Sequence, residues 1–97
     1  MPVQLDRAIQ EEILRYCQVF VPEAEVFVFG SRAIGKATPR SDLDLALRAP
    51  QAIPLERIYQ LKNVFSNSNI PQRIDVIDLN AVTPDFRAVV EAQMVRL

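Results

Sequence analysis

Apolar residues recur every three or four positions along the start of the chain, a spacing that predicts an amphipathic helix over residues 3–20. Polar and charged residues fill most of the positions between them, and Pro22 ends the pattern. Cys17 lies on the apolar stripe, so we expect it to be a small buried hydrophobe rather than a reactive thiol. The stripe consists of Leu5, Ile9, Ile13, Tyr16, Cys17 and Phe20.

Two apolar segments follow, and their different patterns predict two kinds of strand. Residues 25–29 are predicted to form a strand, and four of them, residues 26–29, are apolar in succession, which is typical of a central strand covered on both faces. Residues 42–48 alternate instead, so Asp42 and Asp44 should emerge side by side on the face opposite the core. The leucines expected on the core face are Leu43, Leu45 and Leu47.

The segment between these strands contains Gly30 and Gly35, the two glycines of the chain. We expect a short helical turn over residues 31–36, entered directly from the strand and with Ser31 as its N-cap. Pro39 interrupts the loop that follows. The connection is too short to decide by its length whether the two strands are parallel or antiparallel.

The second half of the chain repeats the order helix, strand, helix. A helix predicted over residues 54–66 begins at a proline, and residues 73–79 form a strand rich in β-branched residues. Thr83 and Pro84 are typical of the start of a last helix, which we expect to extend to Arg96. The side chains expected to face inward are Leu55, Ile58, Tyr59, Leu61, Phe65, Phe86, Val89, Val90 and Met94.

This order of elements predicts an α/β (α+β) fold in which helices flank a small sheet. The length of 97 residues corresponds to one domain, residues 1–97. The start of the chain lacks the features of a signal peptide, and no apolar run approaches the length of a membrane span. With a single cysteine, a disulfide framework is excluded, and we expect a reduced cytoplasmic protein.

Composition narrows the chemistry that is available. Histidine is absent, which excludes catalytic triads and most zinc sites, so any bound metal must be held by oxygen ligands. The net charge of −1 argues against binding an extended nucleic acid through electrostatics alone. A local charge cluster can still bind one phosphorylated ligand.

Three aspartates are the candidate metal ligands. Asp42 and Asp44 share a strand face, and Asp75 lies in the middle of the next predicted strand, where a buried carboxylate needs a charged partner or a metal. If these strands are neighbours, their carboxylates form an all-oxygen site suited to Mg²⁺ with substrate phosphates as further ligands. A salt bridge from Asp75 to Arg73 or Arg87 is the alternative, and Asp78 is expected to be solvated or to cap a turn.

The glycine-containing segment is a candidate anion site. A strand that ends in Gly30-Ser31 and leads into a helical turn presents backbone N–H groups and a hydroxyl above the strand end. Arg32, Lys36 and Arg40 add positive charge to this segment. Each feature alone is common: a Gly-Ser turn caps many helices, and exposed arginines are usually solvated. Together with the aspartates, they indicate a site for a metal-bound nucleoside triphosphate.

These residues closely resemble the motifs of the polymerase-β-like nucleotidyltransferase superfamily, and in particular the MntA-type minimal nucleotidyltransferases (MNT). The resemblance covers residues 26–79 and rests on Gly30-Ser31-Arg32-Ala33, Gly35, Ser41-Asp42-Leu43-Asp44-Leu45 and Ile74-Asp75-Val76. It implies a mixed sheet with the palm-like nucleotidyltransferase fold. Ile34 departs from a position that is often basic in relatives, which affects only a side contact.

The resemblance also implies roles for these residues. Asp42 and Asp44 would bind two Mg²⁺ ions, or Mn²⁺ in their place, and Asp75 would complete the catalytic metal site and help to activate the acceptor. Gly30 and Ser31 would bind the triphosphate of ATP, with assistance from Arg32. The reaction would be transfer of AMP from ATP to a tyrosine hydroxyl of a HEPN-domain toxin, by the antitoxin of a type VII toxin–antitoxin pair.

Alternatives stay open on the sequence alone. The chain has few residues for a second substrate-binding domain, so a partner protein or a second copy of the chain would supply the acceptor surface. A nucleotidyltransferase that acts on a small molecule or an RNA end is one alternative. Others are an antitoxin that neutralises its toxin by binding only, with vestigial aspartates, and a structural metal-binding domain.

Overall fold

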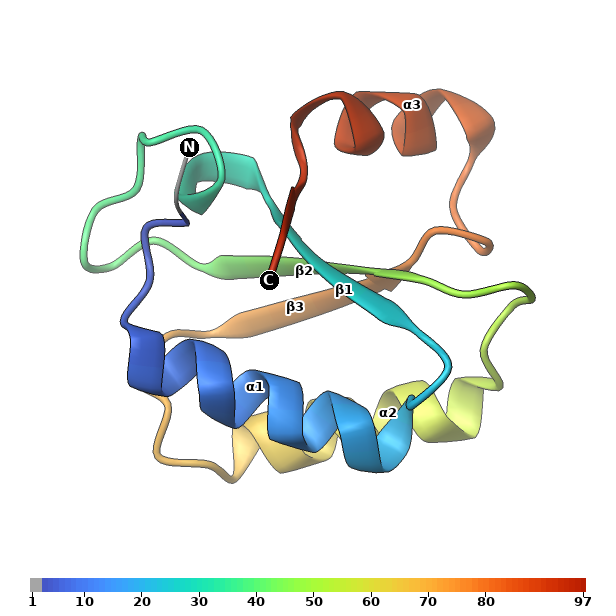
Figure 1. Cartoon of the computed structure of the whole chain (residues 1–97), viewed down its shortest axis with the longest axis horizontal. Coiled ribbons are helices and arrows are strands. Elements are labelled where there is room, and N and C mark those ends of the chain that lie inside the picture. The colour runs from blue at the N-terminus through green and yellow to red at the C-terminus, as the bar shows by residue number, and fades with distance from the viewer. Residues whose placement is uncertain (1–2) are drawn as a thin grey trace.

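A four-stranded mixed sheet in the order β3-β2-β1-β4 forms the centre of the computed structural model, which describes residues 3–97 (Figure 1). Strand β1 is antiparallel to both β2 and β4, whereas β2 and β3 are parallel. The elements are α1 (Arg7–Phe20), β1 (Glu25–Phe29), the 3₁₀ turn η1 (Gly30–Arg32), β2 (Leu43–Arg48), α2 (Leu55–Ser66), β3 (Ile74–Asp78), α3 (Pro84–Gln93) and β4 (Val95–Arg96).

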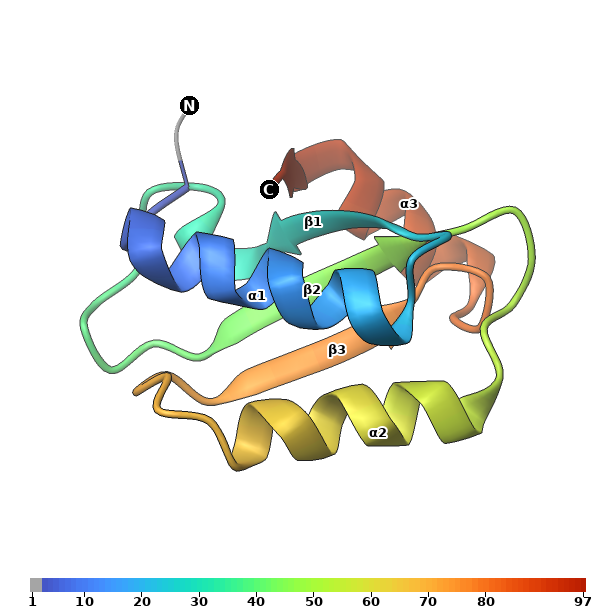
Figure 2. The same ribbon diagram turned by 60° about the horizontal axis from the view of Figure 1, so that its bottom comes forward.

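Helices α1 and α2 cover one face of the sheet, and α3 covers the other (Figures 1 and 2). The larger core lies between the sheet and the α1–α2 layer, and the three leucines of β2 are completely buried in it. The smaller core beneath α3 contains Phe27, Ala46, Leu79 and Val90. Strand β1 is therefore covered on both faces, which confirms the prediction from its continuous apolar pattern.

Four side chains expected to face inward are exposed instead. In α2, Leu55 and Tyr59 are 63% and 61% exposed, and in α3, Phe86 and Val89 are 43% and 57% exposed. Each helix meets the sheet through a narrower stripe than its apolar content suggests, with Ile58, Leu61 and Phe65 buried in α2 and only Val90 in α3. Within residues 3–97, no helix is both long and apolar enough to span a lipid bilayer.

The last predicted helix is shorter than expected. Thr83 caps it as predicted, since its hydroxyl accepts a hydrogen bond from the Phe86 N–H at 3.3 Å. The helix ends at Gln93 rather than Arg96, and Val95–Arg96 form the short edge strand β4. Strand β4 pairs with Phe27 and Val28 of β1, so backbone hydrogen bonds to the sheet replace the last helical turn.

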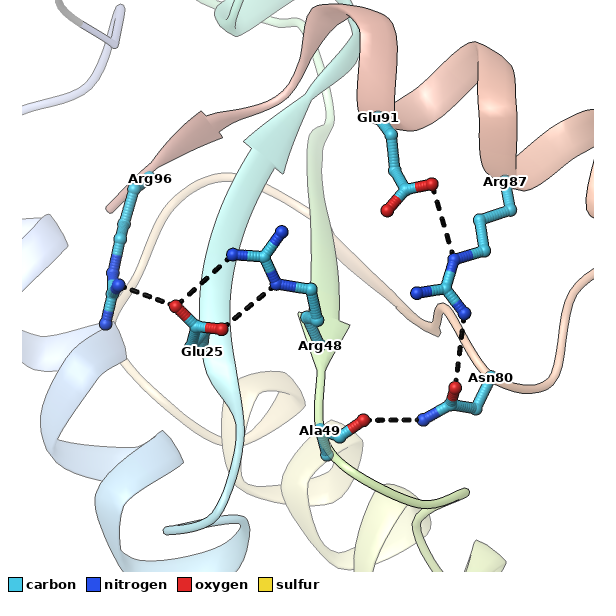
Figure 3. Close-up of polar contacts among 7 residues, drawn as sticks. All are labelled: Glu25, Arg48, Ala49, Asn80, Arg87, Glu91 and Arg96. Carbon is cyan, nitrogen blue, oxygen red and sulfur yellow. Dashed lines mark hydrogen bonds and ion pairs between the residues drawn. The ribbon is translucent and has the colours of Figure 1, made fainter.

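The end of the sheet at which β1 begins is held by a charge network (Figure 3). The Glu25 carboxylate accepts from Arg48 at 3.0 Å and from Arg96 at 2.6 Å, and so connects β1 with β2 and β4. The Arg48 guanidinium also lies over the Phe27 ring, 4.7 Å from its centroid. These contacts account for the lowered pKa of Glu25, whose first cause is the hydrogen bond from Arg48.

Burial in the structure tests two further predictions, those for Cys17 and Asp78. Cys17 is buried, and the loss of solvent raises the pKa of its thiol to about 12, as expected for a core residue that is not reactive. Asp78 is buried rather than solvated, but it does cap local backbone: its carboxylate accepts from the N–H groups of Ile53 at 2.7 Å and Asn80 at 2.9 Å.

Candidate active site

The parallel pairing of β2 with β3 brings two of the three candidate carboxylates together. Asp44 is the register partner of Asp75, so the two residues lie directly opposite each other on adjacent strands. Asp42 comes two residues before Asp44, just ahead of β2. Because alternate residues share a face, all three belong to the sheet face opposite the buried leucines.

Electrostatic repulsion is concentrated on Asp44. Asp44 is partly buried, while Asp42 and Asp75 are exposed. Burial is the first cause of a raised pKa at Asp44, and repulsion from Asp75 and then Asp42 adds to it. The nearest described counter-ion of Asp75 is Arg73, with Nε 3.9 Å from Oδ1, in a pair that is largely exposed and therefore weak. A bound cation would relieve this repulsion.

The donor chemistry of the three aspartates fits Mg²⁺ or Mn²⁺, because these ions prefer oxygen ligands. The pairing of Asp44 with Asp75 and the unfavourable charge on Asp44 agree with such a site. Over residues 3–97, however, no three His, Cys, Asp or Glu side chains are grouped closely enough to hold a metal. The three-aspartate metal site therefore stays a prediction, with the Asp44–Asp75 pair as its structural basis.

Gly30 connects the loop to this carboxylate pair. Its φ of 74° lies in the left-handed region, and a Cβ at this position would lie only 2.5 Å from Asp44 Oδ2. A side chain here would force Asp44 to move. Glycine is thus required both by the backbone conformation and by the close approach of a candidate metal ligand.

Ser31 follows Gly30 but does not cap the turn as expected. The helical turn is a single 3₁₀ turn, Gly30–Arg32, whose N-cap position is Phe29 and which has no side-chain cap hydrogen bond. The turn starts one residue earlier than predicted because Gly30 adopts a positive φ directly after β1. The Ser31 hydroxyl is consequently not used to cap the turn.

The model of one protein family, polymerase beta nucleotidyltransferases, matches residues 11–97. The chain belongs to this family. The match includes the glycine loop and all three aspartates, and it extends well beyond the 26–79 segment that carries the motifs.

Relatives of this nucleotidyltransferase agree with the assignment. The protein named "probable protein adenylyltransferase MntA" of Haemophilus influenzae is 40% identical over 73 residues, which are 75% of this chain and 64% of that protein. A minimal nucleotidyltransferase of known structure is 30% identical, with a TM-score of 0.74 over 94% of this chain and 91% of its own. The chain thus spans somewhat less than two thirds of the length of MntA.

A third similarity concerns the fold alone. A chain from the complex of an MNT antitoxin with a tri-AMPylated HEPN toxin of Shewanella oneidensis has a TM-score of 0.73 and 17% sequence identity. The match covers 95% of the present chain and 71% of that one. Together these structures confirm the predicted mixed-sheet nucleotidyltransferase fold.

Arg32 of the nucleotidyltransferase lies in an unexpected environment. It is 5% exposed, and its guanidinium donates to the backbone carbonyls of Gln4 at 2.8 Å, Thr38 at 3.2 Å and Ser41 at 2.9 Å. These contacts join the start of the chain to both ends of the loop before Asp42. These contacts favour a role in which Arg32 holds the loop in place. They do not favour the direct contact with phosphate that its charge suggests.

Gln93 is the site residue that the sequence did not reveal. Its side-chain oxygen accepts a hydrogen bond from the Gly30 N–H at 3.0 Å, although it lies at the opposite end of the chain. A glutamine at a helix end has no local pattern that indicates such a contact. The pairing of β4 with β1 and the packing of α3 on the sheet bring Gln93 next to the glycine loop.

Proposed function

We propose that this chain is a protein adenylyltransferase that transfers AMP from ATP to a tyrosine hydroxyl of a HEPN-type toxin. It would thereby act as the antitoxin of a type VII pair. Three findings support the proposal: membership of the nucleotidyltransferase family, 40% identity to a protein adenylyltransferase, and the fold shared with an MNT antitoxin complex.

The observation that supports catalysis most directly is the placement of Asp44. It lies opposite Asp75 on one side and against Gly30 on the other, so the glycine loop and a carboxylate pair meet at one residue. Separately, each feature has ordinary structural explanations. In combination, they support the proposal of an anion site next to a cation site, which is what a metal-bound nucleotide requires.

In the proposed reaction, the acceptor oxygen attacks the α-phosphorus of ATP in line with the leaving group. The bond from oxygen to the α-phosphorus forms as the bond from the α-phosphorus to the bridging oxygen breaks, and pyrophosphate leaves. The acceptor proton passes to the Asp75 carboxylate and then to solvent. Asp75 is suited to this step because its side chain is about half exposed on an edge strand, where an acceptor can approach.

The remaining residues would hold the substrate. Asp42, Asp44 and Asp75 are the proposed ligands of two Mg²⁺ ions, which would neutralise phosphate charge and lower the pKa of the attacking hydroxyl. Ser31 would donate to the triphosphate through its N–H and hydroxyl. Arg32 would contribute by holding the loop that carries Ser31 and Asp42.

Co-expression in bacteria separates catalysis from simple binding. The product of the gene adjacent to this one would be expressed alone, with the wild-type chain, or with the Asp42→Asn/Asp44→Asn variant. If the adjacent product is toxic, we expect the wild type to restore growth and the variant to fail while still folding. Equal protection by the variant would favour an antitoxin that acts by binding only. Absence of any protection by the wild type would contradict the antitoxin role.

A further inference from the structure

The Gln93 side chain extends the hydrogen-bond pattern between β1 and β4 beyond the last paired backbone residues. Val28 pairs with Val95, and the Leu97 N–H donates to the Val26 carbonyl at 2.9 Å, which sets the β1–β4 register. Continuing this antiparallel register by two residues places Gln93 opposite Gly30. Gln93 still belongs to α3, and its side-chain oxygen accepts the Gly30 N–H where a strand would offer a backbone carbonyl.

Gly30 is consequently held from two directions. The Gln93 amide oxygen fixes its N–H group, and the Asp44 carboxylate occupies the space where a Cβ would lie. A glycine at a φ of 74° has unusual freedom to rotate its flanking peptide groups. The hydrogen bond to Gln93 removes that freedom at the junction between β1 and the loop.

We propose that Gln93 is a positioning residue for nucleotide binding, an inference that rests on the proposed function. By fixing the peptide group before Gly30, it sets the orientation in which Ser31 presents its N–H and hydroxyl to the triphosphate. The Gly30 N–H is already satisfied by Gln93, so Ser31, rather than Gly30, is the phosphate donor of the loop. Gly30 serves as the pivot that only glycine can supply.

The proposal ties phosphate binding to the position of α3. Helix α3 packs on the sheet through Val90, its one fully buried residue, and Gln93 lies one helical turn further on. Loss of the Gln93 oxygen should loosen the loop without opening this core. The effect should therefore appear in nucleotide affinity and in exchange of the Gly30 amide, with little change in thermal stability.

Two substitutions at one position isolate the hydrogen bond. Gln93→Met keeps a similar volume but removes the acceptor, whereas Gln93→Glu keeps an acceptor oxygen. For Gln93→Met, we expect the Gly30 amide hydrogen to exchange about 10-fold faster and the Kd for Mg-ATP to rise about 5-fold, the scale of one lost hydrogen bond. Gln93→Glu should retain slow exchange at Gly30. Gln18→Met, at an exposed position of α1, is the control and should change neither.

The outcomes distinguish this inference from the function on which it rests. Unchanged Gly30 exchange in Gln93→Met, or faster exchange with an unchanged Kd for Mg-ATP, would overturn the positioning role while nucleotide binding stands. A loss of affinity that only accompanies global unfolding would also overturn it. If the wild type does not bind Mg-ATP at all, the proposed function itself fails, and the role of Gln93 fails with it.

Discussion

Asp44 lies directly opposite Asp75 across the parallel pair β2–β3. Two carboxylates in register on neighbouring strands repel each other, and like charges in this arrangement are destabilising. The cost is raised by the partial burial of Asp44, the first cause of its raised pKa. Such an arrangement is expected where a site is built to bind a cation, since function and stability then make opposite demands.

Removing the charge of Asp44 should therefore stabilise the metal-free protein. Repulsion from an opposed like charge costs about 0.2–1 kcal/mol, so Asp44→Asn should raise the Tm by about 1–5 °C in a chelating buffer. Asp42→Asn removes an exposed charge and should change the stability by less than about 0.5 kcal/mol. Thermal unfolding followed by circular dichroism measures both.

The pH dependence of stability provides an independent check. Because the folded pKa of Asp44 is raised, the folded state binds its proton more tightly than the unfolded state does. The resulting stabilisation is complete below the unfolded value of about 3.9 and is lost as pH rises through the higher folded pKa. Asp44→Asn should lack this component of the pH profile. If the stability of the variant depends on pH in the same way as that of the wild type, the pKa of Asp44 is not raised in the folded state.

Gly30→Ala should impair activity through Asp44. The new Cβ would lie 2.5 Å from Asp44 Oδ2, and the simplest relief is rotation of that carboxylate away from the site. We expect AMP transfer to fall by about 100-fold, on the scale of losing a principal electrostatic group. Gly35→Ala is the matched control for backbone strain, since Gly35 also has a positive φ, 78°. Equal losses of activity in both variants would show that backbone strain alone is responsible.

Arg32→Met tests whether this arginine holds the loop or binds phosphate. Its loss leaves the carbonyls of Gln4, Thr38 and Ser41 without a buried donor, which should lower the stability by about 2–4 kcal/mol. Thermal unfolding should show a Tm lower by about 8 °C or more. Arg40→Met, at an exposed position, should change the Tm very little. A normal Tm combined with weak binding of ATP would instead support direct contact with the nucleotide.

The parts of the fold that the sequence predicts well are those with a local pattern. Strand β2 is the clearest case, because the alternation of Leu43, Leu45 and Leu47 requires one buried face, and all three are fully buried. Strand β4 has only two residues and no period of its own, so its existence depends on pairing with β1. The prediction that Phe86 and Val89 face inward is wrong, because apolar content does not reveal how narrow the contact stripe of a helix is.

The candidate site also combines residues that a local sequence pattern indicates with contacts that depend on the tertiary fold. Gly30, Ser31, Asp42 and Asp44 lie within one segment whose residue types and spacing indicate the chemistry directly. The pairing of Asp75 with Asp44 needs the strand register, which the sequence does not specify. The burial of Arg32 depends on backbone carbonyls that the fold brings together, and no local pattern in the sequence indicates these contacts.

The intact mass of the partner protein shows whether this chain transfers AMP to it. The purified product of the adjacent gene would be incubated with Mg-ATP and the wild-type chain, with the Asp44→Asn variant as the inactive control, and then measured by mass spectrometry. We predict a gain of one or more AMP residues with the wild type, located on a tyrosine by peptide fragmentation, and no gain with the variant. A stable complex in which the toxin keeps its original mass would contradict the account.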